Sequence, residues 1–105
     1  MTEPLRGEVW WAELSDIGRR PFLVMTRSSA IPVLHSVLAA PITHTVRDIP
    51  TELVLDVDDG MPVRCAASFD NLRVVPKVYL VDKQCSLDAL RLVDACKALR
   101  VAVDC

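Results

Sequence analysis

A chain of 105 residues is long enough for one compact domain and too short for two, so residues 1–105 are expected to form a single domain. Its 51% apolar content and mean hydropathy of +0.30 exceed what a small monomer buries easily, which indicates a surface that meets a partner. The net charge of -2 is not the basic excess of a typical nucleic-acid-binding protein, and the lack of a signal-peptide pattern or a membrane-spanning apolar run predicts a cytoplasmic protein.

Four short strands are expected in the first half of the chain. Residues 7–14 are rich in β-forming side chains and end at a turn-prone segment. Residues 21–26 are too short and too apolar on both sides for a surface helix, so they predict a buried strand. A third strand is expected over 36–45, bent at Pro41, and a fourth over 51–57.

The second half predicts more strands and then one helix. Residues 58–60, Asp-Asp-Gly, form the strongest turn signal, and residues 63–75 follow as a long extended run. Residues 78–81 predict another short strand, and apolar residues recur at helical spacing beyond Ser86. The whole pattern predicts a mainly β fold: a small closed or half-closed barrel of five to seven short strands with a C-terminal helix.

The cysteines give no sign of a metal or redox site. They form no Cys-x-x-Cys pair and have no histidine at a zinc-like interval, so no metal and no cofactor are expected. Free cysteine is often a small buried apolar residue, which is the expected role here, with the terminal residue exposed. The four are Cys65, Cys85, Cys96 and Cys105.

Basic residues are concentrated in one stretch of the chain. No acidic residue occurs between Asp16 and Asp48, whereas acidic residues dominate after Asp48. The stretch between them holds Arg19, Arg20, Arg27, His35, His44 and Arg47. This pattern predicts a basic surface, and the alternative is an accidental segregation of charge on a solvated surface.

Several segments, in this order and spacing, resemble the MazF/PemK toxin family. They read RGEVWWAEL, GRRPFLVMT, APITHT followed by IPTELVL, and later SFDNLRVV. The family pattern has a Gly-Asp/Glu-x-x-Trp first strand, a Gly-x-Arg-Pro-x-x-Val second strand and an Ile-Thr at the end of the third. The resemblance spans Arg6 to about Leu80.

This resemblance implies the CcdB/MazF-like fold, an SH3-like barrel that forms a homodimer. It implies a type II toxin that cleaves single-stranded RNA without a metal, an mRNA interferase that leaves 2′,3′-cyclic phosphate and 5′-hydroxyl ends. Arg20 and Thr43 match the catalytic positions. Ser68, Asp70 and Asn71 fall where related toxins line a base-reading pocket, and Asn71 stands where many relatives have glutamine.

The resemblance also implies a cognate antitoxin with a disordered, acidic tail that covers the cleft. Arg19, Arg27 and Arg47 are expected to bind RNA, because RNA and an acidic peptide require the same positive charge. One groove would then serve both ligands. The turn at residues 15–19 is shorter than in many relatives, which indicates a more open cleft or one that other residues close.

The chemistry of these residue types fits RNA cleavage. RNA carries its own nucleophile, the 2′-hydroxyl beside each phosphate, so the enzyme has to orient that group and stabilise charge on phosphorus. The guanidinium of Arg20 suits phosphate oxygens and stays charged, which makes it a poor proton acceptor. The hydroxyl of Thr43 can donate to a phosphoryl oxygen from a fixed strand position.

The two histidines are candidates for acid–base roles, and the two tryptophans are candidates for core or contact positions. His44 adjoins Thr43, and because strand neighbours point to opposite faces we expect it to be a bystander. A mechanism using His35 and His44 together is disfavoured, because their separation of nine places them on opposite faces of one strand. Of Trp10 and Trp11 one is expected in the core, and the other at a dimer interface or against a base.

Two alternatives come from other functional classes. A CcdB-like toxin shares this barrel but binds DNA gyrase, and fold alone does not separate the two. A gyrase-binding toxin of the CcdB type ends in Trp-Gly-Ile, whereas this chain ends in Val-Asp-Cys, which argues against this alternative. A catalytically silent SH3-like binding module is the second alternative, and the Arg20 and Thr43 pair argues against it.

Overall fold

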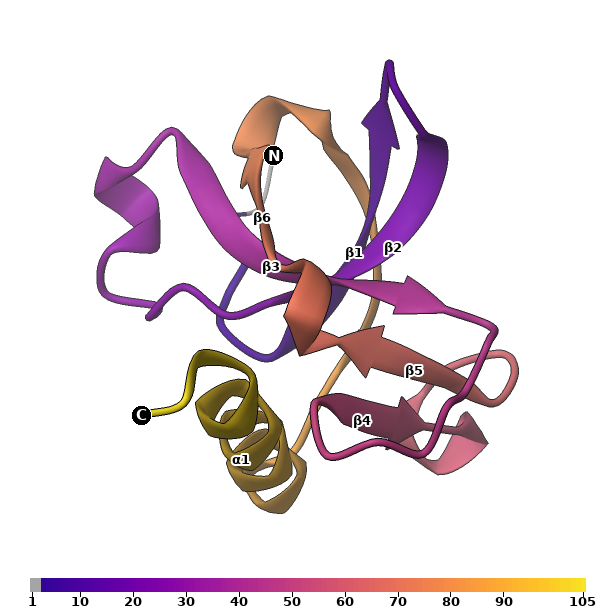
Figure 1. Ribbon diagram of the computed structural model, residues 1–105. Helices are drawn as coiled ribbons and strands as arrows, with labels where there is room; N and C mark the ends of the chain where they lie inside the picture. Colours follow the sequence, from indigo (N-terminus) through magenta and orange to yellow (C-terminus); the bar gives the residue numbers. More distant parts are fainter. Residues whose placement is uncertain (1–2) are drawn as a thin grey trace.

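The computed structural model describes residues 3–105, which form seven strands, four short 3-10 helices and one α-helix (Figure 1). The strands are β1 (Glu8–Leu14), β2 (Gly18–Val24), β3 (Ser36–Thr43), β4 (Glu52–Leu55), β5 (Cys65–Ser68), β6 (Arg73–Pro76) and β7 (Leu80–Ser86). The helices are η1 (Ile31–Val33), η2 (Val57–Asp59), η3 (Phe69–Asn71), η4 (Lys77–Tyr79) and α1 (Ala89–Val103).

The strands form one antiparallel sheet in the order β4-β5-β3-β2-β1-β7, and β6 also pairs with β3. β3 changes partners along its length, because residues 36–39 pair with β6 whereas Ile42 and Thr43 pair with β5. The prediction of a mainly β fold with five to seven strands and a C-terminal helix is confirmed. The hydrogen-bonded path ends at β4 and β7, so the described sheet is bent but open, and full closure of the barrel is not found.

Both faces of the central strands are buried, each in its own apolar cluster. Along β1, Val9 joins the cluster that contains Ala95 and Ala98 of α1, whereas its neighbour Trp10 joins the other cluster. Successive strand residues point to opposite faces, so a strand buried on both sides must be apolar at consecutive positions. This explains the apolar run from Phe22 to Val24 in the second half of β2, and the prediction of a buried strand there is confirmed.

Helix α1 packs beside β4 and η3, at the end of the molecule opposite the tip of the β1–β2 hairpin (Figure 1). Asp88 caps its N-terminus, because the Asp88 carboxylate accepts a hydrogen bond of 2.9 Å from the backbone N–H of Arg91. The Arg91 guanidinium in turn donates to Asp59 at 2.8 Å and to the backbone carbonyl of Val54. In the described chain, no helix has the length and apolarity needed to span a membrane.

Several element boundaries differ from the prediction. β3 ends at Thr43 and β4 at Leu55, each two residues before its predicted end. β2 begins at Gly18, not at Pro21, because its first residues already pair with β1. The run over 63–75 is divided by η3, where Asp and Asn favour a turn. The strand expected over 78–81 begins at Leu80 and extends to Ser86, because the preceding residues form η4.

Candidate functional site

A groove opens where β2 and β3 separate. The two strands pair from Phe22 to Val24 only, and beyond Phe22 and Pro41 β2 stays with β1 while β3 turns to β5. A proline stands at this point in each strand, and proline supplies no N–H to a ladder. The groove has a volume of about 640 Å³ and is lined by Trp11, Ile17, Arg19, Arg20, Pro21, Pro41, Ile42, Thr43 and His44.

Arg20 and Thr43 lie on the two strands that border this groove. Phe22 pairs with Pro41, and Arg20 and Thr43 each stand two residues beyond this pair, where β2 and β3 no longer pair with each other. The structure therefore brings together the two residues that the sequence predicts as catalytic, and both line the groove.

The hydroxyl of Thr43 is oriented by its own backbone. Its oxygen accepts a hydrogen bond of 3.1 Å from the backbone N–H of Thr45, where the chain bends at the end of β3. Thr43 is half-buried, so the β-branched side chain is also fixed by its surroundings. With the oxygen acting as acceptor toward Thr45, the hydroxyl proton remains available to a ligand in the groove.

The two arginines of the groove differ in their partners. Arg19 donates to Asp82 at 2.7 Å and to Glu13 at 3.4 Å, and its guanidinium lies over the Trp11 ring, 5.2 Å from the ring centroid. The hydrogen bond to Asp82 raises the pKa of Arg19. Arg20 is exposed, and its guanidinium has no ion pair or hydrogen bond with any residue from 3 to 105. Arg20 therefore supplies the uncompensated positive charge of the groove.

His44 also lines the groove, and the expectation that it points away is wrong. Strand alternation predicted the opposite face, but β3 ends at Thr43 and His44 lies in the bend that follows, where alternation no longer applies. His35 lies at the other end of β3, which is eight residues long and spans about 27 Å. A mechanism that uses both histidines of one chain is therefore excluded.

The other predicted RNA-binding residues lie outside the groove lining. Ser68 and Asn71 contact each other, with the Asn71 amide donating to the Ser68 hydroxyl at 2.9 Å. Asp70 accepts a hydrogen bond of 2.6 Å from the Thr51 hydroxyl. Ser68 follows Ala67, which pairs with Ile42 of the groove, so this cluster begins one residue beyond the groove wall.

The basic stretch of the sequence is partly neutralised in the fold. Arg47 pairs with the buried carboxylate of Glu52 at 3.3 Å, and its backbone N–H donates to the same side chain. Arg27 is exposed and, within residues 3–105, has no ion pair. Glu13, Asp82 and Glu52 thus compensate part of the positive charge. The predicted basic surface is confined mainly to Arg20 and Arg27.

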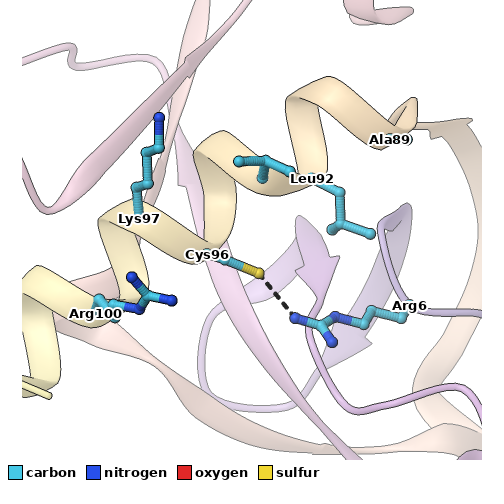
Figure 2. A pocket seen from close by; sticks show the side chains of 7 residues that line it. Arg6, Ala89, Leu92, Cys96, Lys97 and Arg100 are labelled. Carbon is cyan, nitrogen blue, oxygen red and sulfur yellow. Dashed lines mark hydrogen bonds between the residues drawn. The ribbon is translucent and has the colours of Figure 1, made fainter.

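A second hollow, of about 410 Å³, lies between α1 and the segment before β1, and no sequence pattern marked it. Figure 2 shows the Arg6 guanidinium directed at Cys96 of α1, to which it donates a hydrogen bond of 2.9 Å. Lys97 and Arg100 complete a basic rim over an apolar wall that includes Leu92. Arg6 and Cys96 are 90 residues apart, so only the folded chain shows their contact.

The expectation of buried cysteines is met fully at Cys65 only, since Cys85 and Cys96 are half-buried. Cys65 is buried in the core beside α1, and burial raises the pKa of its thiol to about 11, which keeps it protonated and inert. Cys105 is exposed at the terminus. No group of three or more His, Cys, Asp and Glu side chains within residues 3–105 is arranged to hold a metal ion.

Comparison with known proteins identifies relatives over nearly the whole chain. The family model described as PemK-like, MazF-like toxin of type II toxin-antitoxin system matches residues 5–103. The "Probable endoribonuclease MazF5" of Mycobacterium tuberculosis is 45% identical over 103 residues, which cover 97% of this chain and 94% of that protein. The solved Mycobacterium tuberculosis toxin MazF-mt6 is 32% identical with a TM-score of 0.84, over 92% of this chain and 96% of that one. A mycobacterial endoribonuclease in complex with its cognate antitoxin is 26% identical with a TM-score of 0.87, over 96% and 95%.

Proposed function

Because the chain belongs to the PemK-like, MazF-like toxins of type II toxin-antitoxin systems, we propose that it cleaves single-stranded RNA as an endoribonuclease and thereby inhibits translation and growth. The 2′-hydroxyl of one nucleotide attacks the adjacent phosphate, which leaves a 2′,3′-cyclic phosphate and a 5′-hydroxyl. The observation that carries this proposal is that Arg20, whose guanidinium has no ion pair within residues 3–105, lines one groove together with Thr43.

Arg20 stabilises the transition state of this reaction. Negative charge accumulates on the phosphoryl oxygens as the 2′-oxygen attacks, and a guanidinium can donate to two of these oxygens at once. Because Arg20 has no carboxylate partner within residues 3–105, its donors are free before RNA binds. No ion pair has to be broken, so its charge is available when the phosphate arrives.

Thr43 positions the same phosphate. The bond from Thr45 N–H fixes the Thr43 oxygen, so its hydroxyl proton is directed toward a phosphoryl oxygen at little cost in side-chain entropy. A donor that is already oriented before the charge develops contributes on the order of 10²-fold to 10³-fold in rate. Since the RNA supplies the nucleophile, neither residue needs a cofactor, and cleavage is proposed to proceed without a metal.

The RNA extends from the groove in two directions. Toward β7, Arg19 and the Trp11 ring offer a cation and an aromatic face for a phosphate and a base. Toward β5, the hydroxyl of Ser68, the amide of Asn71 and the carboxylate of Asp70 offer donors and acceptors for base edges. Arg27 and Arg47 contribute positive charge along the backbone of the RNA.

The gyrase-binding alternative is not retained. The matching family is that of the PemK-like and MazF-like toxins, and the described groove holds the arginine and hydroxyl that phosphodiester cleavage needs. Neither gyrase inhibition nor simple binding requires the unpaired guanidinium of Arg20 and the oriented hydroxyl of Thr43 in one groove.

A cognate antitoxin is the proposed regulator. A structural relative was solved in complex with its own antitoxin, which supports the same kind of partner here. An acidic segment of the antitoxin would occupy the groove beside Arg20, so it would compete with RNA for one site. Simultaneous binding of RNA and antitoxin at full stoichiometry would contradict this competition.

The active form is proposed to be a homodimer of one-domain chains (residues 1–105) in the cytoplasm. Leu38 of β3 and Val74 of β6 are paired in register, and both are exposed, at 38% and 62%. Nearby, η1 exposes Val33 at 80%. Exposed apolar side chains of this size favour association. Light scattering of the wild type and of Val74→Lys tests whether this surface is part of the contact.

The nuclease proposal is tested by incubating the purified protein with a long mixed-sequence RNA in EDTA and mapping the cut ends. We expect cuts at one short motif, with cyclic-phosphate and 5′-hydroxyl ends. Arg20→Ala should lower the cleavage rate by about 10³-fold. Arg100→Ala removes an exposed arginine of α1 outside the groove and should cleave like the wild type. Undiminished cleavage by Arg20→Ala, or equal losses in both variants, contradicts the proposal.

A further inference from the structure

The lining of the groove includes one imidazole side chain, that of His44. The rest of the lining within the described chain consists of apolar residues, two arginines and one threonine. Arginine stays protonated in proteins and a threonine hydroxyl is a very weak acid, so neither can accept the proton that leaves an attacking 2′-hydroxyl. Imidazole ordinarily changes its charge between pH 5 and 8, which suits general acid–base catalysis.

The bend at the end of β3 brings His44 to the same wall of the groove as Thr43. In a continued strand the two side chains would point to opposite faces. The chain instead turns after Thr43, and the hydrogen bond from Thr45 N–H to the Thr43 hydroxyl spans His44 and fixes this turn. His44 is exposed, so its imidazole can reach a ligand without displacing core side chains.

The charged groups around His44 are few. From β2, Arg20 and Arg19 face the groove, and Glu13 of β1 and Asp82 of β7 are held by Arg19. From β5, the residue that pairs with Thr43 is Ala66, which carries no charge. In the loop after His44, Arg47 is occupied by Glu52, and Asp48 lies 3.8 Å from Arg64, which directly precedes β5. Neither Glu13 nor Asp82 lines the groove, so no carboxylate of the described lining competes with His44 as a base.

We propose that His44 is the general base of the reaction, an inference that rests on the proposed nuclease function. The neutral imidazole of His44 takes the proton of the 2′-hydroxyl as the 2′-oxygen forms its bond to phosphorus. The bond between phosphorus and the 5′-oxygen breaks, and the departing 5′-oxygen takes a proton from solvent. The imidazolium then returns its proton to solvent, so the enzyme is unchanged after one turnover.

The proposal is tested with His44→Gln and His44→Ala, and His35→Gln at the far end of β3 serves as the matched control. Cleavage of one short RNA is measured under single-turnover conditions between pH 5 and 9. Binding is measured separately with the same sequence carrying 2′-O-methyl groups, which cannot be cleaved. Thermal unfolding of each variant checks that the exposed substitution leaves the fold intact.

We expect both His44 variants to cleave at least about 10²-fold more slowly, with affinity for the 2′-O-methyl RNA within twofold of the wild type. The wild-type rate should fall on acidification, because a protonated imidazole cannot accept a proton, and His44→Gln should lose this dependence. Added imidazole should restore part of the rate of His44→Ala but leave His35→Gln unaffected.

Three results would overturn the assignment: a His44→Gln rate within threefold of the wild type, an unchanged pH profile in that variant, or a loss of affinity as large as the loss of rate. Failure of the nuclease function itself is distinguishable, since the wild type would then not cleave at any pH. A wild type that cleaves beside an equally active His44→Gln refutes the role of His44 alone.

Discussion

The hydroxyl oxygen of Thr43 accepts a hydrogen bond of 3.1 Å from the backbone N–H of Thr45, across the bend that ends β3. This bond fixes the side-chain rotamer and leaves the hydroxyl proton as the only hydrogen that Thr43 can offer to a ligand. The same bend turns His44 toward the groove. One local contact thus positions two of the groups proposed to act on the phosphate.

The Thr43 hydroxyl can be removed at nearly constant volume. Thr43→Val keeps the β-branched shape but loses the donor, so we expect a fall of about 10²-fold in the single-turnover rate with RNA affinity within threefold. Thr43→Ser keeps the hydroxyl and should retain most of the rate. Equal rates for the valine and serine variants would show that the hydroxyl does not contribute.

Arg19 is expected to act on binding and not on chemistry. Its guanidinium is already shared between Asp82, Glu13 and the Trp11 ring, so its charge is largely compensated before RNA arrives. Arg19→Ala should weaken binding of 2′-O-methyl RNA about threefold to tenfold and change the saturating cleavage rate less than twofold. Fluorescence anisotropy measures the binding, and the Trp11 emission reports the loss of the stacked cation. A larger loss in rate than in affinity would assign Arg19 to the transition state.

Local patterns in the sequence predicted the strands, and the resemblance to the MazF/PemK family implied the Arg20–Thr43 pair. Apolar runs, prolines and turn residues mark the strands, and the Gly-Arg-Arg-Pro and Pro-Ile-Thr motifs mark the groove. The apolar run from Phe22 to Val24 in β2 indicated a strand buried on both faces, because such a strand has no alternation of polar and apolar residues.

The position of His44 and the charge balance could not be predicted in this way. The alternation of side chains between the two faces of a strand does not extend to His44, because β3 ends at Thr43. Only the Thr43–Thr45 contact reveals that the strand has ended there. The compensation of Arg19 depends on Asp82, 63 residues away, which β7 brings alongside β1. Such pairs follow from sheet topology, and no spacing along the chain encodes them.

Glu8 makes stability depend on pH. Burial raises the pKa of Glu8, but hydrogen bonds from Trp10 and Leu5 and the ion pair with Lys83 outweigh it, so the pKa is lowered overall. A carboxyl with a lowered folded pKa stabilises the fold above its ordinary value near 4.3 and loses this contribution as the pH falls through the folded value.

Glu8→Gln tests this linkage, because glutamine still accepts from Trp10 but carries no charge. At pH 7 the wild type should be more stable by about 1 kcal/mol. The difference should shrink below pH 4.5 as Glu8 becomes protonated and resembles glutamine. Urea unfolding at several pH values measures it, and a difference independent of pH would contradict the role of the carboxylate.

Two glycines with positive φ offer a matched test of how the β7 strand packs on the turn after η2. Gly18 (φ +78) has open space around an added Cβ, whereas at Gly60 (φ +99) that Cβ would lie 2.6 Å from the Cβ of Cys85. Gly18→Ala should therefore cost only the backbone strain, about 1 kcal/mol of unfolding free energy. Gly60→Ala adds a steric clash and should cost roughly 2–5 kcal/mol.

The clash at Gly60 can be separated from the strain by removing the atom that causes it. Cys85→Gly deletes the contacting Cβ, so the double variant Gly60→Ala/Cys85→Gly should be more stable than the sum of the two single losses predicts. The same glycine placed at Cys85 should not improve Gly18→Ala, because no atom of Cys85 lies within 4 Å of an added Cβ there. If the losses of unfolding free energy in Gly60→Ala and Cys85→Gly simply add in the double variant, β7 relaxes away from the turn. The contact between the added Cβ and Cys85 would then not determine the packing at this site.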